Sequence, residues 1–319
     1  MQHSDDKLHP VAISQVMLNF ALRNGIDQQT CLLGTGISET ELSSGEGLVT
    51  RTQEMRLIEN LMLALPEVGV GGFELGLQYN LATFGVWGFA LRTCKTLRDA
   101  VALGLRYLPL STAYCRITVC EDGDAFGVIF DPDPIPPHLR QFLLERDMAT
   151  ALNLVREITF QGVEFRGVEF TGEPDVAASA IEALCGMAPA IHASANRILV
   201  NRAGASQPFP GYDPVLTRML EQQCQQRMDT VENSGLAGKV RQKLLGELGL
   251  GATLHDMASE LALSTRSLRR KLEQEGTSYR DLVEEERRQL ALQLLDSPTS
   301  KLEELAAPLG DTEAGGFVR

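Results

Sequence analysis

The chain lacks the sequence features that mark membrane proteins, secreted proteins and the common enzyme classes. Its 319 residues contain no apolar run of the roughly 18 residues needed to span a bilayer. The N-terminus, MQHSDDKLHP, lacks the charged-then-apolar pattern of a secretory signal. No H-E-x-x-H, G-x-S-x-G or P-loop motif is present, and the five histidines do not cluster in the sequence. We therefore expect a cytoplasmic protein that is not an enzyme, uses no cofactor or metal, and does not bind membranes.

Cysteine is sparse, and its spacing argues against a metal or redox motif. The six cysteines are scattered through apolar segments and form no C-x-x-C pair. We expect buried free thiols, with a redox role for Cys115 and Cys120 as the alternative.

Positive charge is also in short supply. The sequence has 29 Lys and Arg residues against 42 Asp and Glu residues, which gives a net charge of −13. This balance keeps nonspecific affinity for nucleic acid low, so any DNA binding has to depend on a small focused patch. One such patch lies near the C-terminal end, where four basic residues fall within two helical turns: Arg266, Arg269, Arg270 and Lys271.

The stretch from residue 253 to residue 275 predicts two short amphipathic helices joined by a tight connection. Its apolar residues recur at helical spacing, first at Leu254, Met257, Ala258 and Leu261, then at Leu263, Leu268 and Leu272. Ser264 has the position and side chain of an N-cap for the second helix. A short turn followed by a basic helix is typical of a helix-turn-helix, in which arginine can bond guanine O6 and N7 together. An ordinary helical hairpin with a solvated basic face is the alternative.

The same pattern begins again after one long helix. Ser278 and Asp281 predict a capping box for a helix that starts at Tyr279 and ends at Pro298. The spacing then repeats at Leu302, Leu305, Ala306 and Leu309. A second helix-turn-helix is therefore expected to begin here.

This arrangement resembles the AraC family of bacterial transcription regulators. The resemblance rests on the run LHDMASELALSTRSLRRKL, the step from Gly276 to Tyr279, Arg287 and Ala291 in the connecting helix, and KLEELAAPLG before GFVR. It implies that two reading helices enter successive major-groove segments on one face of the DNA. Arg266, Arg269 and Arg270 match base-reading positions of the first unit, and Arg319 is the only match in the second. The predicted DNA-binding residues are Ser264, Thr265, Arg266, Ser267, Arg269, Arg270, Lys271 and Arg319.

The second unit departs from the family pattern. Asp311 stands where the family has an aromatic residue. Gly315 and Gly316 occupy the expected start of its reading helix, and each glycine costs ~1 kcal/mol relative to alanine. The family also continues beyond the Phe-x-Arg at which this sequence stops, so we expect the second unit to be incomplete.

The front of the chain predicts helices with a few antiparallel strands. Helices are expected over 10–24, 28–33, 50–65, 97–107 and 139–158, and strands over 115–120, 125–130, 162–170 and 198–200. The expected fold is α+β and mostly helical, with a mixed N-terminal sensor domain over 1–232. An all-α domain over 233–319 would carry the tandem helix-turn-helix units.

The front half also resembles the sensor domain of one branch of the AraC family. The similar segments are Gly85 to Gly88, Thr96 to Ala100, and Arg106 to Leu110. The resemblance implies that the domain binds a small effector and often pairs two subunits.

Several aromatic and basic residues of this half combine apolar walls with polar contacts, as small-molecule sites do. The candidate ligand-binding residues are Phe84, Trp87, Arg92, Tyr107, Tyr114 and Arg116, with Phe89 beside them. Plain core packing is the alternative for the aromatic residues. Arg92 or Arg116 either holds a ligand carboxylate or forms a structural salt bridge.

The predicted function is that of a ligand-responsive transcription regulator. It would bind double-stranded promoter DNA sequence-specifically, respond to a small-molecule effector, form a homodimer and, by the resemblance, activate transcription through RNA polymerase. The alternative is a sensor and dimerisation protein with one working helix-turn-helix that acts by pairing with an intact relative.

Overall fold

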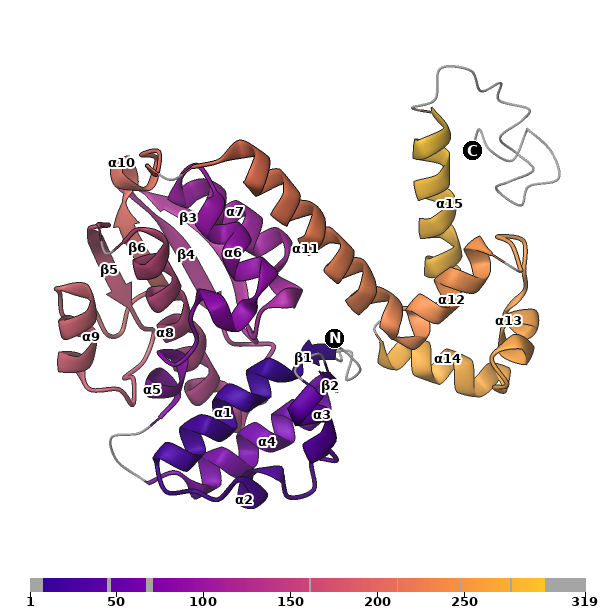
Figure 1. Ribbon diagram of the computed structural model, residues 1–319, viewed down its shortest axis with the longest axis horizontal. Helices are drawn as coiled ribbons and strands as arrows, with labels where there is room; N and C mark the ends of the chain where they lie inside the picture. The colour runs from indigo at the N-terminus through magenta and orange to yellow at the C-terminus, as the bar shows by residue number, and fades with distance from the viewer. Residues whose placement is uncertain are drawn as a thin grey trace. The chain divides into compact units, whose positions relative to one another are not determined.

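The computed structural model describes residues 8–44, 47–66, 71–160, 162–210, 212–246, 248–275 and 277–295 (Figure 1). The chain divides into two compact units between Met228 and Asp229. We call them the front unit (His9–Met228) and the C-terminal unit (from Asp229 onward). The front unit combines helices with two small sheets, whereas the described elements of the C-terminal unit are all helices. The expected α+β, mostly helical fold is therefore confirmed.

Helices and a short two-stranded sheet open the front unit. These elements are β1 (Leu8–Pro10), α1 (Val11–Arg23), α2 (Gln28–Leu32), α3 (Glu39–Ser44), β2 (Leu48–Thr50) and α4 (Arg51–Ala64). The start of α4 is a complete capping box, because Thr50 Oγ1 accepts from the Gln53 amide and Gln53 Oε1 accepts from the Thr50 amide. Sequence periodicity predicted α1, α2 and α4, while α3 and both strands were missed.

The next segment folds as short helices and helical turns. It contains α5 (Gly72–Gly76), η1 (Leu81–Phe84), α6 (Val86–Thr93), α7 (Leu97–Arg106) and η2 (Leu108–Leu110). A Cβ placed on Gly72 would lie 1.9 Å from the carbonyl oxygen of Phe142, and one on Gly76 would lie 2.3 Å from that of Arg146. Glycine is therefore required where α5 crosses α8 (Arg140–Ile158).

A four-stranded antiparallel sheet forms the other part of the front unit. Its strands are β3 (Arg116–Asp122), β4 (Ala125–Asp131), β5 (Phe165–Glu169) and β6 (Asn196–Asn201), in the order β3-β4-β6-β5. The predicted hairpin is β3–β4, and its turn contains Gly123 at φ 57°, in the left-handed region that favours glycine. The predicted strands over 162–170 and 198–200 correspond to β5 and β6.

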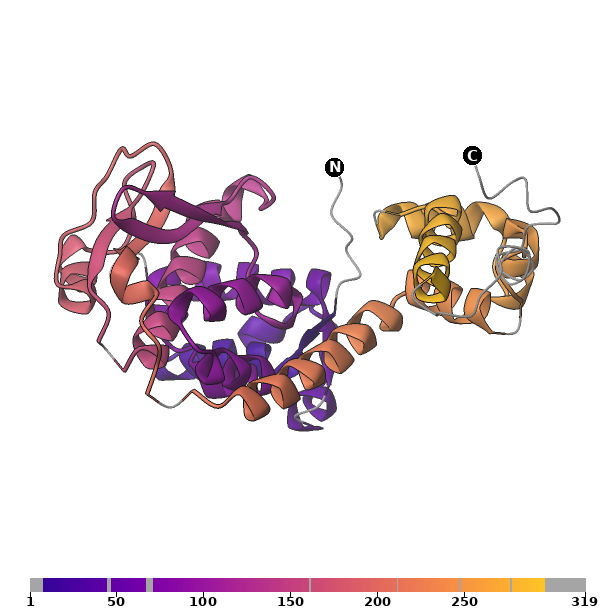
Figure 2. The same ribbon diagram turned by 90° about the horizontal axis from the view of Figure 1, so that it is seen from above.

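The remaining elements of the front unit are helical. They are η3 (Pro137–Leu139), α8, α9 (Ala178–Cys185), α10 (Arg202–Ala205) and the first part of α11 (Pro214–Ser234), of which α8 and α10 pack on the sheet. Helix α8 packs against α5, α6 and β4. The first part of α11 runs beside α6 and α7 (Figures 1 and 2), where the Thr217 hydroxyl donates to the carbonyl oxygen of Thr93. Within the described residues, no helix has the length and apolar character needed to cross a bilayer.

All six cysteines lie in the described part of the chain, and all are free thiols. Cys31, Cys94, Cys115 and Cys224 are buried, while Cys120 and Cys185 are half-buried. Burial raises the pKa of Cys94 to about 12 and that of Cys224 to about 11. These thiols therefore stay protonated and unreactive near neutral pH. Burial is confirmed for four of the six.

Candidate functional site

The C-terminal unit consists of a helical pair flanked by two further helices. Its elements are α12 (Leu236–Leu245), α13 (Leu254–Glu260), α14 (Thr265–Gln274) and α15 (Tyr279–Leu295). The predicted start of α15 at Tyr279 is confirmed.

The turn between α13 and α14 has the length and capping of a helix-turn-helix. Ser264 is the N-cap of α14, and its Oγ accepts from the Ser267 amide at 3.1 Å, which confirms the predicted cap. Ala262 in the turn has φ 54°, a conformation that side chains rarely adopt. At the start of α13, Thr253 and Asp256 form a capping box, and hydrogen bonds from Thr253 lower the pKa of the Asp256 carboxyl.

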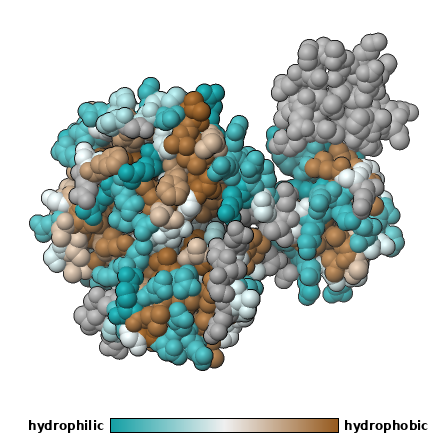
Figure 3. All heavy atoms as spheres, in the orientation of Figure 1, coloured by the Kyte–Doolittle hydropathy of each residue, from teal (hydrophilic) through white to brown (hydrophobic). Residues whose placement is uncertain are grey.

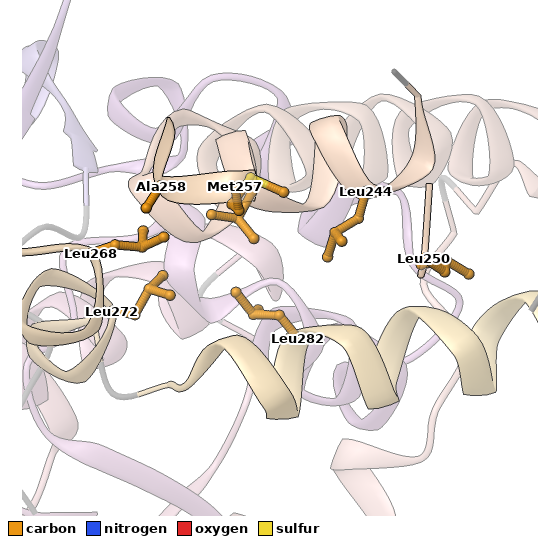
Figure 4. Packing of buried hydrophobic residues seen from close by; sticks show 8 residues of the cluster. Leu244, Leu250, Met257, Ala258, Leu268, Leu272 and Leu282 are labelled. Atoms are coloured by element: carbon orange, nitrogen blue, oxygen red, sulfur yellow. The ribbon is translucent and has the colours of Figure 1, made fainter. Parts of the chain in front are cut away.

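A small apolar core fixes α14 against its neighbours. Figure 4 shows side chains from α12, α13, α14 and α15 pointing toward one another. Leu268 and Leu272, four residues apart on α14, are fully buried in this core. The buried members of the cluster are Val240, Leu244, Leu250, Met257, Ala258, Leu268, Leu272 and Leu282. The apolar periodicity read from the sequence therefore describes the face that packs inward.

The opposite face of α14 is basic and exposed to solvent. Arg266, Arg269 and Arg270 follow one another at helical spacing on the side away from Leu268 and Leu272. Their side chains and that of Lys271 are exposed, and none has an ion-pair or hydrogen-bond partner among the described residues. Unpaired guanidinium groups on a capped helix are available for an external anion or base edge. Thr265 and Ser267 are half-buried beside them.

Helix α12 also carries three basic residues, and two of them have partners within the protein. Arg241 forms an ion pair with Glu286 at 3.2 Å, and Lys243 pairs with Glu260 at 2.7 Å. Lys239 is exposed. Counting only partners among the described residues, more cations are left unpaired on α14 than on α12.

The second predicted unit lies outside the described residues. It includes the pattern from Leu302 to Leu309 and the candidate base-reading residue Arg319. The prediction that this unit is incomplete therefore stays a prediction.

A carboxylate joins the end of α14 to the beginning of α12. Glu275 follows α14, and its two oxygens accept from the backbone amides of Leu236 and Ala237, each at 2.7 Å. These amides are among the free N–H groups at the start of α12, whose N-cap Gly235 supplies no side chain. Glu275 thus ties the position of the basic helix to the helix that enters the C-terminal unit.

Replacing Glu275 by glutamine is expected to destabilise the C-terminal unit by about 1–2 kcal/mol, because an amide offers only one acceptor and no charge to the two N–H groups. Hydrogen exchange over residues 236–245, resolved by mass spectrometry, measures the change. Glu273→Gln, an exposed site on the same helix, is the matched control. Equal protection in the two variants would show that Glu275 does not hold α12.

The front unit contains a pocket of about 240 Å³. Phe84 and Trp87, two of the predicted ligand-binding residues, line it and pack edge to face with ring centroids 5.1 Å apart. Its other lining residues come from the start of α1, from residues 47–48, from residues 82–86, from η2 and from α11: Pro10, Ala12, Ile13, Gly47, Leu48, Ala82, Thr83, Gly85, Val86, Leu110 and Arg227.

The remaining predicted ligand-binding residues do not line this pocket. Arg92 is exposed, with its guanidinium 4.6 Å from the centre of the Phe160 ring. Arg116 is exposed and pairs with Asp131 at 3.0 Å, so the salt-bridge alternative is the one observed. Phe89 is half-exposed on α6.

Tyr107 and Tyr114 are both buried, but they face different neighbours. The Tyr107 hydroxyl donates to Gln225 Oε1 of α11 at 3.2 Å. The guanidinium groups of Arg51 and Arg146 both lie over the Tyr114 ring, 4.3 Å and 5.0 Å from its centre. Burial raises the pKa of the Tyr114 hydroxyl well above its usual value. The sequence therefore grouped residues that the fold separates.

Sequence reasoning missed a fully buried ion pair in the middle of α8. Arg146 is completely buried, and its guanidinium bonds Asp147 Oδ1 at 2.8 Å and the carbonyl oxygen of Thr112. Asp147 Oδ2 also accepts from the amides of Tyr114 and Cys115, at 2.7 Å and 2.8 Å. The only signal in the sequence was three successive charges, Glu145 to Asp147, directly between the apolar runs Phe142–Leu144 and Met148–Ala149.

Comparisons with known proteins identify the family. Residues 25–209 match the family model described as the arabinose-binding domain of AraC transcription regulators. The chain belongs to the AraC family of transcription regulators. It is 31% identical to Rv1395, an uncharacterized HTH-type transcriptional regulator of Mycobacterium tuberculosis, over 97% of this chain and 91% of that protein.

Two further proteins are similar to this AraC regulator. The ornithine utilization regulator of Pseudomonas aeruginosa is 27% identical over 98% of this chain and 92% of its own length. The crystal structure of the transcriptional regulator CdpR from Pseudomonas aeruginosa aligns with a TM-score of 0.47 and 20% identity, covering 96% of this chain and 92% of CdpR. The family model and the 31% identity to Rv1395 confirm the family resemblance expected from the sequence.

Proposed function

We propose that this AraC regulator binds promoter DNA sequence-specifically through α14, responds to a small effector in the front unit, and activates transcription. The observation that carries the proposal is the basic face of α14. It presents three arginines that have no partner within the described part of the chain, on a helix that is capped by Ser264 and fixed by Leu268 and Leu272. A rigid helix with free planar donors suits bidentate contacts to guanine in the major groove.

The charge distribution supports a specific rather than a general affinity for DNA. The whole chain carries a net charge of −13, so the acidic surplus repels phosphate except where the basic residues are concentrated. Lys271 is suited to neutralise a phosphate, whereas the arginines are suited to read base edges.

Helix α11 supports the link between effector and DNA. It runs continuously from Pro214 to Ser234, so it belongs to the front unit at its start and to the C-terminal unit at its end. An effector that restrains this helix needs to supply only ~1 to 3 kcal/mol of coupling free energy to alter DNA affinity.

We include a homodimer and contact with RNA polymerase in the proposal. Membership of the AraC family supports both. Apolar patches occur on the visible face of the front unit (Figure 3), and α11 exposes Val215 and Met219, four residues apart on one helix face. Such patches suit association with another protein surface.

Replacing Arg269 by alanine is expected to weaken binding to DNA from upstream of the regulator's own gene by ~1 to 3 kcal/mol and to relax discrimination at one base step. Titrations with this DNA and with a scrambled sequence measure the effect. Arg56→Ala in α4 makes the same charge change in the front unit and serves as the control. Equal losses on both DNAs would make Arg269 a phosphate contact rather than a base-reading residue.

A further inference from the structure

The pocket of the front unit has mainly apolar walls. Ile13, Phe84, Trp87 and Leu110 line it, and each side chain is less than a tenth exposed in the folded chain. At about 240 Å³ it is smaller than the roughly 300–1,000 Å³ typical of sites for drug-sized molecules. Its size and walls suit a small ligand with a short apolar or aromatic body.

One cation lies among these walls. Arg227 is the one ionisable residue among the described residues that line the pocket, and it has no ion-pair or hydrogen-bond partner among the described residues. The indole Nε1–H of Trp87 is also buried, and no described residue accepts a hydrogen bond from it. Both groups are donors, and a guanidinium binds a carboxylate through two parallel N–H···O bonds. The polar chemistry of the pocket therefore favours an anionic acceptor.

The position of Arg227 connects the pocket to α11. Contacts with the rest of the front unit hold the preceding turns of this helix: Thr217 bonds Thr93, Glu221 pairs with Arg106, and Gln225 accepts from Tyr107. Arg227 lies beyond these contacts, in the last turn before the division between Met228 and Asp229. An anion held by Arg227 would add one more anchor at the point where α11 leaves the front unit.

We propose that this pocket is the effector site and that its ligand is a small carboxylate with an apolar body, bound through Arg227. This inference rests on the proposed function, since it names the site and the chemical class of the effector. Phe84 and Trp87 contact the apolar body, while the guanidinium pairs with the carboxylate. Binding then restrains α11 and changes the DNA affinity of the C-terminal unit.

The fluorescence of Trp87 tests the proposal directly, because it is the only tryptophan in the chain and it lines the pocket. The full chain is titrated with benzoate, phenylacetate and hexanoate, and with benzyl alcohol and benzylamine as neutral and cationic probes of similar shape. At least one carboxylate is expected to give a saturable change, with a Kd about tenfold or more below that of either non-acidic probe.

Variants of two arginines on α11 distinguish a specific contact in the pocket from a general effect of the positive charge on this helix. Arg227→Gln is expected to raise the carboxylate Kd by about tenfold or more. Arg218→Gln, an exposed arginine on the same helix that does not line the pocket, is expected to leave it within about twofold. Both positions are exposed, so neither change removes core packing.

The proposal is overturned if no carboxylate saturates the fluorescence change, if the alcohol or the amine binds as tightly, or if the two variants behave alike. DNA binding, measured separately, distinguishes this failure from that of the proposed function. Specific DNA binding without carboxylate binding would contradict the proposal for the pocket but not the proposed DNA binding. Carboxylate binding that leaves DNA affinity unchanged would support the pocket and contradict ligand-responsive regulation.

Discussion

Replacing Asp147 by alanine is expected to destabilise the front unit by about 3–5 kcal/mol. The change leaves the completely buried Arg146 guanidinium without its ion-pair partner, and it also removes the acceptor of the Tyr114 and Cys115 amides. Removing one partner of a buried ion pair lowers stability far more than removing one partner of a solvent-exposed pair, because water cannot solvate the remaining buried charge.

Denaturant unfolding of the full chain measures this loss of stability. Hydrogen exchange over α8 locates it in the front unit. Asp133→Ala is the control, since the Asp133 side chain is 80% exposed and its carboxylate lies 4.0 Å from the Arg140 guanidinium, a long distance for an ion pair. The control is expected to change stability by less than about 0.5 kcal/mol. If both variants unfolded at the same denaturant concentration, the Arg146–Asp147 pair would not stabilise the front unit.

Replacing Leu268 by alanine is expected to cost the C-terminal unit about 2–5 kcal/mol and to abolish specific DNA binding. Leu268 is fully buried where α14 meets the core that includes Met257 and Ala258 of α13 (Figure 4). The cavity left by the missing atoms removes the packing that holds the basic face of α14 in one orientation. The free energy of unfolding of a small unit is low, so the loss caused by one such cavity is a large fraction of it.

Leu245→Ala provides the matched control, because Leu245 is a leucine of the same unit that is 60% exposed. Hydrogen exchange over residues 254–282 and DNA titration report folding and binding together. The control should retain both. A Leu268→Ala variant that kept native exchange protection and specific binding would show that this core does not position α14.

The helical pair α13–α14 was predictable because local signals and tertiary packing agree there. Ser264 caps α14 both by sequence rule and by hydrogen bond, and the apolar period at Leu268 and Leu272 is the buried face. Local signals and strand pairing also agree at the β3–β4 hairpin, which was predicted. Gly123 has a left-handed backbone conformation in its turn, and the two apolar runs on either side pair as strands.

The rest of the candidate site depends on contacts between distant segments. Helix α5 contains Gly72 and Gly76, which weaken helix propensity, and it forms because its backbone lies directly against α8. From the sequence, Arg92 and Arg116 were grouped with Trp87 because aromatic and basic residue types together are typical of a small-molecule site. The fold instead brings Arg227 to Trp87 from α11. Charge and aromatic content identified the residue types but not which of them meet.

The affinity of the purified chain for DNA upstream of its own gene and for scrambled DNA, across a salt series, tests the central claim most directly. We predict that binding to the upstream DNA persists at physiological salt and is tighter than binding to the scrambled DNA by roughly a thousandfold or more. Binding that is equal on both DNAs and falls steeply with salt would contradict specific recognition by α14. It would favour instead a protein that acts by pairing with an intact relative.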